Sequence, residues 1–106
     1  MIVTPGSTIA DRRVKRTLGL VRGNTIRARH LGKDIMAGLK AMVGGEIEEY
    51  TKMMAEAREQ SVDRMVAEAK SLGADAITDV RFSTSYLMGA AAEILVYGNA
   101  VELEGE

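Results

Sequence analysis

The feature that most constrains the fold is one long helix, expected from about Glu46 to Leu72. Gly44-Gly45 precede it and Gly73 follows it, and no Gly or Pro interrupts it. At about 1.5 Å per residue, these roughly 27 residues span about 40 Å. A compact chain of 106 residues has a radius of gyration of only about 13 Å. Because the helix is as long as the whole protein would be wide, we expect it to pack beyond its own subunit.

Apolar and small residues recur every three or four positions along this helix and form one continuous stripe. They are Ile47, Tyr50, Met54, Ala57, Ser61, Met65, Ala69 and Leu72. The centre of the stripe, at Ala57 and Ser61, is small enough for another backbone to approach closely. One interpretation is a helix that lies on its own sheet, and the other adds a contact with a neighbouring subunit.

The rest of the chain predicts strands and one short helix. The spacing of apolar residues places strands over residues 14–22, 25–29, 76–83 and 91–103, and the short helix over residues 33–43. Gly23-Asn24 is interpreted as a turn between the first two strands, and residues 83–89 as a loop or hairpin. The last strand is apolar on both faces, which in so small a protein indicates a partner.

The length predicts a single domain over residues 1–106, with residues 1–13 as a loose arm or an edge strand. The absence of Cys excludes disulfides and thiolate metal sites or nucleophiles. Neither an apolar signal region at the N-terminus nor a run of 18 apolar residues occurs, so we expect no secretion and no membrane span. A cytoplasmic location is the resulting expectation.

The two halves of the chain carry opposite charge. Up to Gly45 there are nine basic and two acidic residues, and after it five basic and thirteen acidic ones. Three interpretations are open: the two halves fold against each other, the basic half meets the acidic half of a neighbour, or it binds nucleic acid. The sequence shows no aromatic stacking platform and no helix-turn-helix pattern, and both absences argue against nucleic acid as a partner.

Several motifs resemble one known family over roughly residues 14–103. They are Asp34 to Gly45, Tyr50, Ala57-Arg58, Leu72-Gly73-Ala74-Asp75-Ala76 and Tyr97-Gly98-x-Ala100-Val101. On these residues the chain resembles the YbjQ-like family of uncharacterised proteins, some of which carry the description "putative heavy-metal-binding".

The resemblance implies an α+β subunit with a β-α-β-β core, in which one short and one long helix pack on a small antiparallel-rich sheet. It also implies a ring-shaped homopentamer, and it implies no agreed activity. Two residues depart from the family's pattern: Asn99 stands where members usually carry Thr, and Ser83 where an Asp is common.

Metal binding is limited by the donors that the chain offers. A transition-metal site needs His, Cys or clustered carboxylates, and this chain has one His, His30, among basic residues. A surface or interface imidazole is the simpler interpretation of His30. Single carboxylates from several copies can still converge in a symmetric ring. A metal ion therefore stays a candidate cofactor, with no ligands assigned.

Four residues are candidates for binding a small ligand: Asp34, Tyr50, Arg58 and Arg81. Arg58 lies among the apolar positions of the long helix, where it can hold a carboxylate at a subunit seam. No catalytic residue is assigned, because no Cys and no Gly-x-Ser-x-Gly motif occurs. The simpler interpretation of Arg81 is a surface ion pair with Asp79.

We therefore predict a cytoplasmic homo-oligomer, a pentamer by the family resemblance, that binds a small ligand or a metal ion. Two alternatives stay open. One is an enzyme with an inter-subunit active site that uses Asp34, Tyr50 or Arg58. The other is a nucleic-acid-binding protein that uses the basic N-terminal half.

Overall fold

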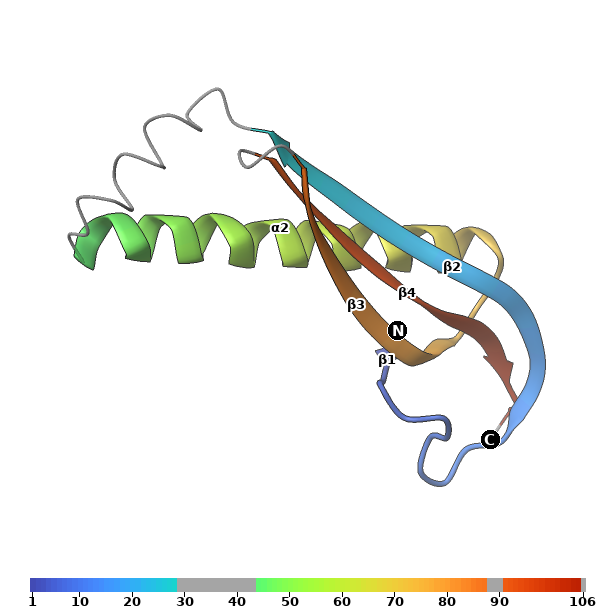
Figure 1. The fold of residues 1–106 in the computed structure, drawn as a ribbon. Coiled ribbons are helices and arrows are strands. Elements are labelled where there is room, and N and C mark those ends of the chain that lie inside the picture. Colours follow the sequence, from blue (N-terminus) through green and yellow to red (C-terminus); the bar gives the residue numbers. More distant parts are fainter. Residues whose placement is uncertain (29–43, 88–90, 106) are drawn as a thin grey trace.

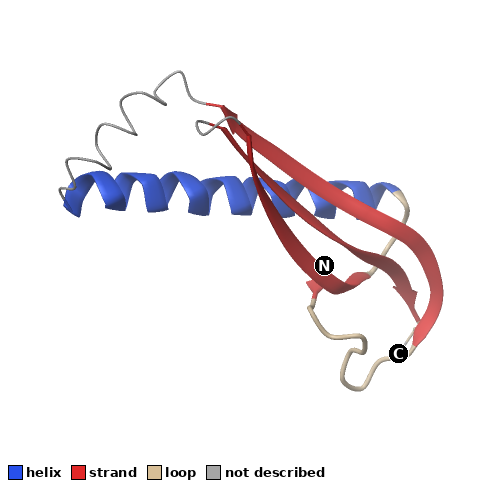
Figure 2. Cartoon of the chain, viewed as in Figure 1, coloured by secondary structure: helices blue, strands red, loops and turns tan. Residues whose placement is uncertain are grey.

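The structure, a computed structural model, describes residues 1–28, 44–87 and 91–105. In this part of the chain one helix lies across a four-stranded sheet (Figures 1 and 2). The elements are β1 (Ile2–Val3), β2 (Val14–Ala28), α2 (Gly44–Ser71), β3 (Ala76–Leu87) and β4 (Ala91–Leu103). The predicted α+β class is confirmed. The short helix expected over residues 33–43 lies outside the described residues.

The sheet has the strand order β1-β3-β4-β2 and is mixed. β4 pairs antiparallel with both β3 and β2, whereas β1 pairs parallel with the start of β3. β3 and β4 form a hairpin whose last pair is Leu87 with Ala91. The predicted loop at residues 83–89 is therefore too long, because Ser83, Thr84 and Ser85 continue β3. β2 and β3 are both edge strands over most of their length.

The long helix α2 is confirmed, with ends within two residues of those predicted. Its first turns project past the end of the sheet in Figure 1. The molecule is correspondingly elongated, with extents of 56 × 22 × 16 Å and a radius of gyration of 17.3 Å. A compact chain of this length would have a radius of gyration of about 13 Å.

The predicted turn at Gly23-Asn24 is wrong, because β2 runs unbroken from Val14 to Ala28. Gly23 has a different use: it lies where the backbone of α2 crosses β2. A Cβ atom added there would meet the carbonyl oxygen of Ser61 and would lie 2.5 Å from the backbone nitrogen of Met65. Only glycine allows the helix and the strand to come this close.

Two buried hydroxyl groups hold this crossing together. The Oγ1 atom of Thr25 and the Oγ atom of Ser61 lie 2.9 Å apart, and Thr25 Oγ1 also donates to the Ala57 carbonyl at 3.1 Å. Ser61 Oγ is within donating distance of two carbonyl oxygens, that of Ala57 at 2.9 Å and that of Ile94 at 3.1 Å. Both side chains are thus satisfied inside the core, as buried hydroxyls must be.

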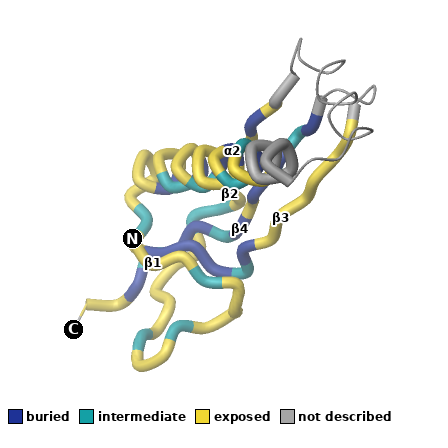
Figure 3. The backbone as a smooth tube through the Cα atoms, turned by 90° about the vertical axis from the view of Figure 1, so that its left-hand side faces the viewer, coloured by how far each residue is buried: buried dark blue, intermediate teal, exposed yellow. Residues whose placement is uncertain are grey.

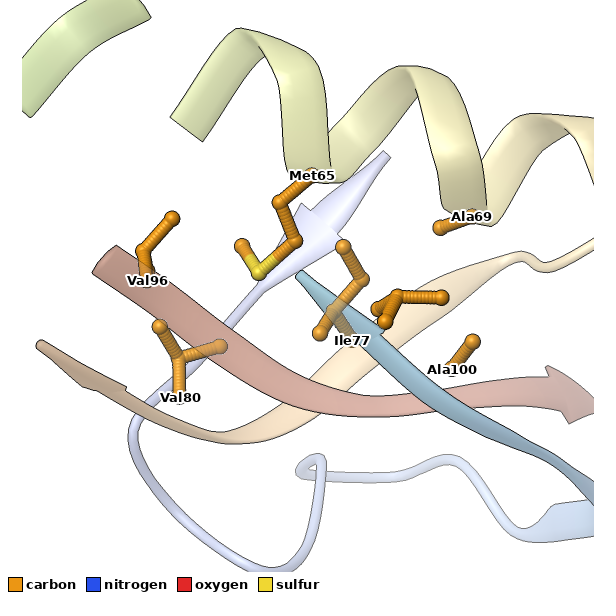
Figure 4. Close-up of a cluster of buried hydrophobic side chains, with 7 residues drawn as sticks. Met65, Ala69, Ile77, Val80, Val96 and Ala100 are labelled. Carbon is orange, nitrogen blue, oxygen red and sulfur yellow. The ribbon is translucent and has the colours of Figure 1, made fainter. Parts of the chain in front are cut away.

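The main apolar core fills the space between the C-terminal half of α2 and the sheet (Figure 4). Its buried members are Val21, Met65, Ala69, Ile77, Val80, Val96 and Ala100. The predicted stripe is confirmed at five positions, which are buried: Met54, Ala57, Ser61, Met65 and Ala69. Leu72 was expected on the stripe but is 46% exposed, because α2 ends at Ser71.

The strands bury fewer apolar residues than their sequences suggest. Leu20 in β2 is 61% exposed and Phe82 in β3 is 51% exposed. Register shifts interrupt the simple alternation: one in β3 lies between Thr78 and Arg81, and two lie in β2 before Gly19. Among the described residues of one copy, the second face of β4 is covered at its end, where Ile9 packs on Val101 and its neighbours. That a partner covers the rest of this face stays a prediction.

Replacing Gly23 with alanine should destabilise the protein, since the new methyl group would collide with the backbone of α2 rather than with a movable side chain. We expect a loss of about 1–3 kcal/mol in the free energy of unfolding, measured by denaturant titration. Gly105→Ala is the matched control, since no atom lies within 4 Å of a Cβ there. Equal stability of the two variants would contradict the close approach.

Candidate functional site

The four predicted ligand residues do not meet within one copy. Asp34, like His30, lies outside the described residues, and Tyr50 falls within the first half of α2. Arg58 is exposed on α2. Arg81 pairs in register with Tyr97, whose neighbours Val96 and Gly98 face the helix, so Arg81 lies on the sheet face away from α2. A site that used both arginines would need more than one copy.

The structure instead gathers polar side chains around Asp79, at the irregular part of β3. Ser7 Oγ donates to Oδ1 of Asp79 at 2.9 Å. Thr78 Oγ1 and Asn99 Nδ2 each donate to Oδ2 at 3.2 Å. We call Ser7, Thr78, Asp79 and Asn99 the Asp79 cluster. The sequence did not predict this cluster. The position of Asp79 within a strand that is otherwise rich in apolar residues was a signal for a bulge.

The backbone of Asp79 is in the left-handed region, with φ of 54°. Aspartate and asparagine adopt this conformation more readily than other residues that carry a side chain. The bend turns the Asp79 backbone towards the N-terminal segment, and Asp79 N donates to the Gly6 carbonyl at 3.0 Å. Val80 N likewise donates to the Thr4 carbonyl at 3.1 Å. The cluster therefore anchors the N-terminal segment along β3.

The predicted ion pair between Asp79 and Arg81 does not form. The Arg81 guanidinium donates through Nη1 to the Pro5 carbonyl at 2.8 Å and to its neighbour's carbonyl, that of Val80, at 2.9 Å. Its charge still acts on the carboxylate at longer range. The hydrogen bond from Ser7 is the main cause that lowers the pKa of Asp79, with smaller contributions from Asn99, Thr78 and the charge of Arg81.

The Asp79 cluster contains one carboxylate and three neutral donors, which is a poor metal site. Across residues 1–28, 44–87 and 91–105, no three His, Cys, Asp or Glu side chains come together as metal ligands would. Three carboxylates gather at a shallow hollow on the outer side of α2. It is lined by Lys52, Ala55, Glu56, Glu59, Gln60 and Asp63. These carboxylates do not converge within one copy.

A second arrangement lies on the sheet face away from α2. Arg22 in β2 and Arg81 in β3 are both register partners of Tyr97 in β4, so one aromatic ring stands between two arginines. Tyr97 is 37% exposed and both arginines are exposed. We call these three residues the arginine–tyrosine rung. The sequence did not reveal it, because only strand pairing brings the three residues together.

No helix in the described part of the chain is long and apolar enough to cross a membrane.

Comparison with known proteins gives a consistent family. The family described as "Putative heavy-metal-binding" matches residues 1–104. A UPF0145 protein of Methanosarcina acetivorans is 55% identical over 103 residues, covering 97% of each chain. UPF0145 proteins of Archaeoglobus fulgidus and Dehalococcoides mccartyi are each 57% identical, covering 97–98% of this chain and 95% and 100% of theirs.

One solved structure shares the fold. It is the crystal structure of a protein of unknown function, of the DUF74 family, from Pediococcus pentosaceus. The TM-score is 0.65 at 16% sequence identity, and the match covers 98% of both chains. At this identity the likeness shows the fold alone.

Acid should weaken the anchoring of the N-terminal segment through Asp79. Because the pKa of this carboxyl is lowered in the folded state, its contribution to stability is present above the unfolded pKa of about 3.9. The contribution is lost as the pH falls through the folded pKa. Asp79→Asn keeps the left-handed backbone and removes the charge. Its loss of stability should be largest near pH 7 and should shrink below about pH 4.

Thermal unfolding between pH 7 and pH 3 measures this difference. Asp63→Asn, on the exposed outer side of α2, is the control and should differ from the wild type by a small amount. A pH-independent effect of Asp79→Asn would contradict the assigned role of the carboxylate.

Proposed function

This chain belongs to the family described as "Putative heavy-metal-binding", and from that premise we propose that it works as a homo-oligomeric binding module. Five copies would close into a ring and hold a small ligand or a metal ion between them. The number five rests on the resemblance of the sequence motifs to the YbjQ-like family. The expected cytoplasmic location belongs to the same proposal.

The observation that carries this proposal is the surface of the single chain. It exposes 7021 Å², whereas a compact monomer of 11.4 kDa exposes about 5,800 Å². The excess of roughly 1,200 Å² approaches what a ring member loses at two neighbours, since a standard interface covers about 800 Å² on each partner. Association with copies of itself would bring the chain to the exposure of a compact protein.

A site between copies also agrees with the placement of the candidate residues. Within one copy, Arg58 is exposed on α2, whereas Arg81 lies on the sheet face away from α2. In a ring, a residue from one copy can complete the set of its neighbour. We propose Arg58 and Arg81, with Asp34 and Tyr50, as the first residues to test for binding an anionic or polar ligand.

The donors in the chain favour one kind of metal. Soft heavy metals are held by thiolates, and the sequence has no Cys and a single His. Its thirteen acidic residues after Gly45 supply carboxylate oxygens, which suit harder ions such as Ca²⁺ or Mn²⁺. The residues therefore do not fit a thiolate-held heavy metal. A metal bound in this ring would be held by oxygen ligands from several copies.

Light scattering at micromolar concentration should give a mass several times 11.4 kDa, and a value near five times that mass supports the pentamer. In metal titrations, Ca²⁺ or Mn²⁺ should raise the melting temperature of the assembly, whereas thiophilic ions such as Cd²⁺ should not. A monomer would refute the ring. An assembly that no ion stabilises would refute metal binding and leave the small ligand.

Nucleic-acid binding is a second candidate because of the arginine–tyrosine rung. Sheet faces that bind single strands combine an exposed aromatic ring, on which a base stacks, with basic side chains for the phosphates. Tyr97 between Arg22 and Arg81 supplies both on one exposed face. This arrangement provides the stacking group that was not visible in the sequence.

If this second function is correct, the wild type should bind a single-stranded oligonucleotide at low salt, and Tyr97→Ala should weaken binding by about tenfold, from the loss of base stacking. Lys70→Ala is the control, since it removes an exposed charge in the last turn of α2, whereas the rung lies on the sheet face away from α2. Fluorescence anisotropy measures both. Absence of binding by the wild type would eliminate this candidate.

A further inference from the structure

Two stretches of sheet edge have no strand partner among the described residues. β2 is the last strand in the order and pairs only with β4. β1 pairs only with Ala76 and Ile77 at the start of β3, so the rest of β3 also forms an edge. We call residues 20–28 of β2 and residues 81–87 of β3 the β2 and β3 edge stretches. Both pair with the same half of β4, so they lie at the same end of the sheet.

The outward backbone groups of the β2 edge stretch can be identified from one contact. Nη1 of Arg64 donates to the carbonyl oxygen of Asn24 at 2.6 Å, so this carbonyl is accessible on the outer side of the strand. The register with β4 is regular from Leu20 to Ala28. In a regular strand every second residue directs its N–H and C=O to the same side. Leu20, Arg22 and Ile26 therefore also present backbone groups outward, and the Asn24 oxygen keeps a second lone pair.

The opposite halves of the same two strands are protected, whereas no described residue protects these stretches in the same way. Two register shifts and Gly19, with φ of 132°, distort the first part of β2. The N-terminal segment covers the first part of β3 through its bonds to Ile77, Asp79 and Val80. Bulges and covering segments are the usual means by which proteins prevent strand addition. In the described structure, the two edge stretches lack such irregularities.

Large apolar side chains are exposed on these same stretches. Leu20 and Ile26 on β2 are 61% and 55% exposed, and Phe82 and Tyr86 on β3 are 51% and 69% exposed. Figure 3 shows this part of β3 in the exposed class beside the covered β4. Phe82 pairs with the buried Val96 and Tyr86 with the buried Ala92, so both aromatic rings lie on the side of the sheet that carries α2.

A second copy of this chain fits the two edges better than a foreign strand. The two stretches form the two lateral edges of the sheet and differ in sequence. Their lengths are similar, roughly 23–30 Å at 3.3 Å per residue. One copy can therefore offer its β2 stretch to one neighbour and its β3 stretch to the other. A contact between different surfaces generates a ring when the rotation closes. Phe82 and Tyr86 would then be covered beside the α2 helix of the neighbour.

We propose that the β2 edge stretch of one copy pairs with the β3 edge stretch of the next, so that the sheet continues from subunit to subunit. This inference rests on the proposed homo-oligomer and adds the surface through which it forms. The excess exposed area of the chain is of the size that two such contacts would cover. Backbone hydrogen bonds provide the pairing, and the exposed apolar side chains provide the buried area.

Charged substitutions on the two stretches test the pairing. Ile26→Lys and Tyr86→Lys should each reduce the mass measured by light scattering from that of the assembly towards 11.4 kDa, with the helical circular dichroism retained. Leu72→Lys is the matched control, because Leu72 is 46% exposed, follows the last residue of α2 and belongs to neither edge stretch, and it should keep the mass of the wild type. An assembly that tolerates both edge variants would overturn the proposal.

Cysteine cross-linking tests the same contact without relying on dissociation, since the chain has no native Cys. Ile26 and Ser85 share the sheet face away from α2, because both are register partners of Glu93. The double variant Ile26→Cys/Ser85→Cys should form a ladder of covalent oligomers on oxidation, and each single variant should not. Dimers from Ile26→Cys alone would show pairing of β2 with itself and overturn the proposal.

These experiments distinguish a failure of the homo-oligomer from a failure of the edge contact. A wild-type monomer would refute both the homo-oligomer and its edge contact. A wild-type oligomer that shows neither edge sensitivity nor the mixed cross-link would refute the edge contact alone.

Discussion

The close approach of α2 to β2 at Gly23 determines much of this structure. A Cβ atom at this position would collide with the helix backbone at Ser61 and Met65, so the distance between the two layers depends on the absence of one methyl group. Thr25 and Ser61 then bond across the crossing and to the Ala57 and Ile94 carbonyls. Small residues at the centre of the helix stripe are thus matched by a glycine in the strand below.

The position of this crossing also determines which part of the sheet α2 leaves uncovered. α2 lies over β2 and β4 and makes little contact with β3, so the aromatic side chains of β3 on that side stay exposed. The first turns of the 28-residue helix project beyond the strands (Figure 1). Among the described residues, a single copy therefore has its main apolar core at one end and exposed aromatic side chains of β3 at the other. The proposed oligomer and its edge contact both follow from this uneven coverage.

The side chains that this chain offers for binding a ligand or an ion are oxygen donors and arginines. The chain has no thiolates, and no three metal-ligating side chains converge in the described part of one copy. The proposed binding would therefore draw on several copies or on an extended face. The arginine–tyrosine rung and the acidic outer side of α2 lie on opposite sides of the two-layer subunit. A repeating assembly would place many copies of each in a symmetric array.

The long helix, its buried stripe and the α+β class could be predicted from the sequence, because helical period and glycine borders are local signals. It could not distinguish a glycine that makes a turn from one that admits a helix, and Gly23 was misinterpreted for that reason. The exposure of Leu20 and Phe82, the cluster around Asp79 and the rung at Tyr97 were decided only by strand pairing. Strand pairing, with its register shifts, and the N-terminal segment bring together residues that are far apart in the chain. Such contacts leave no periodic pattern in the sequence.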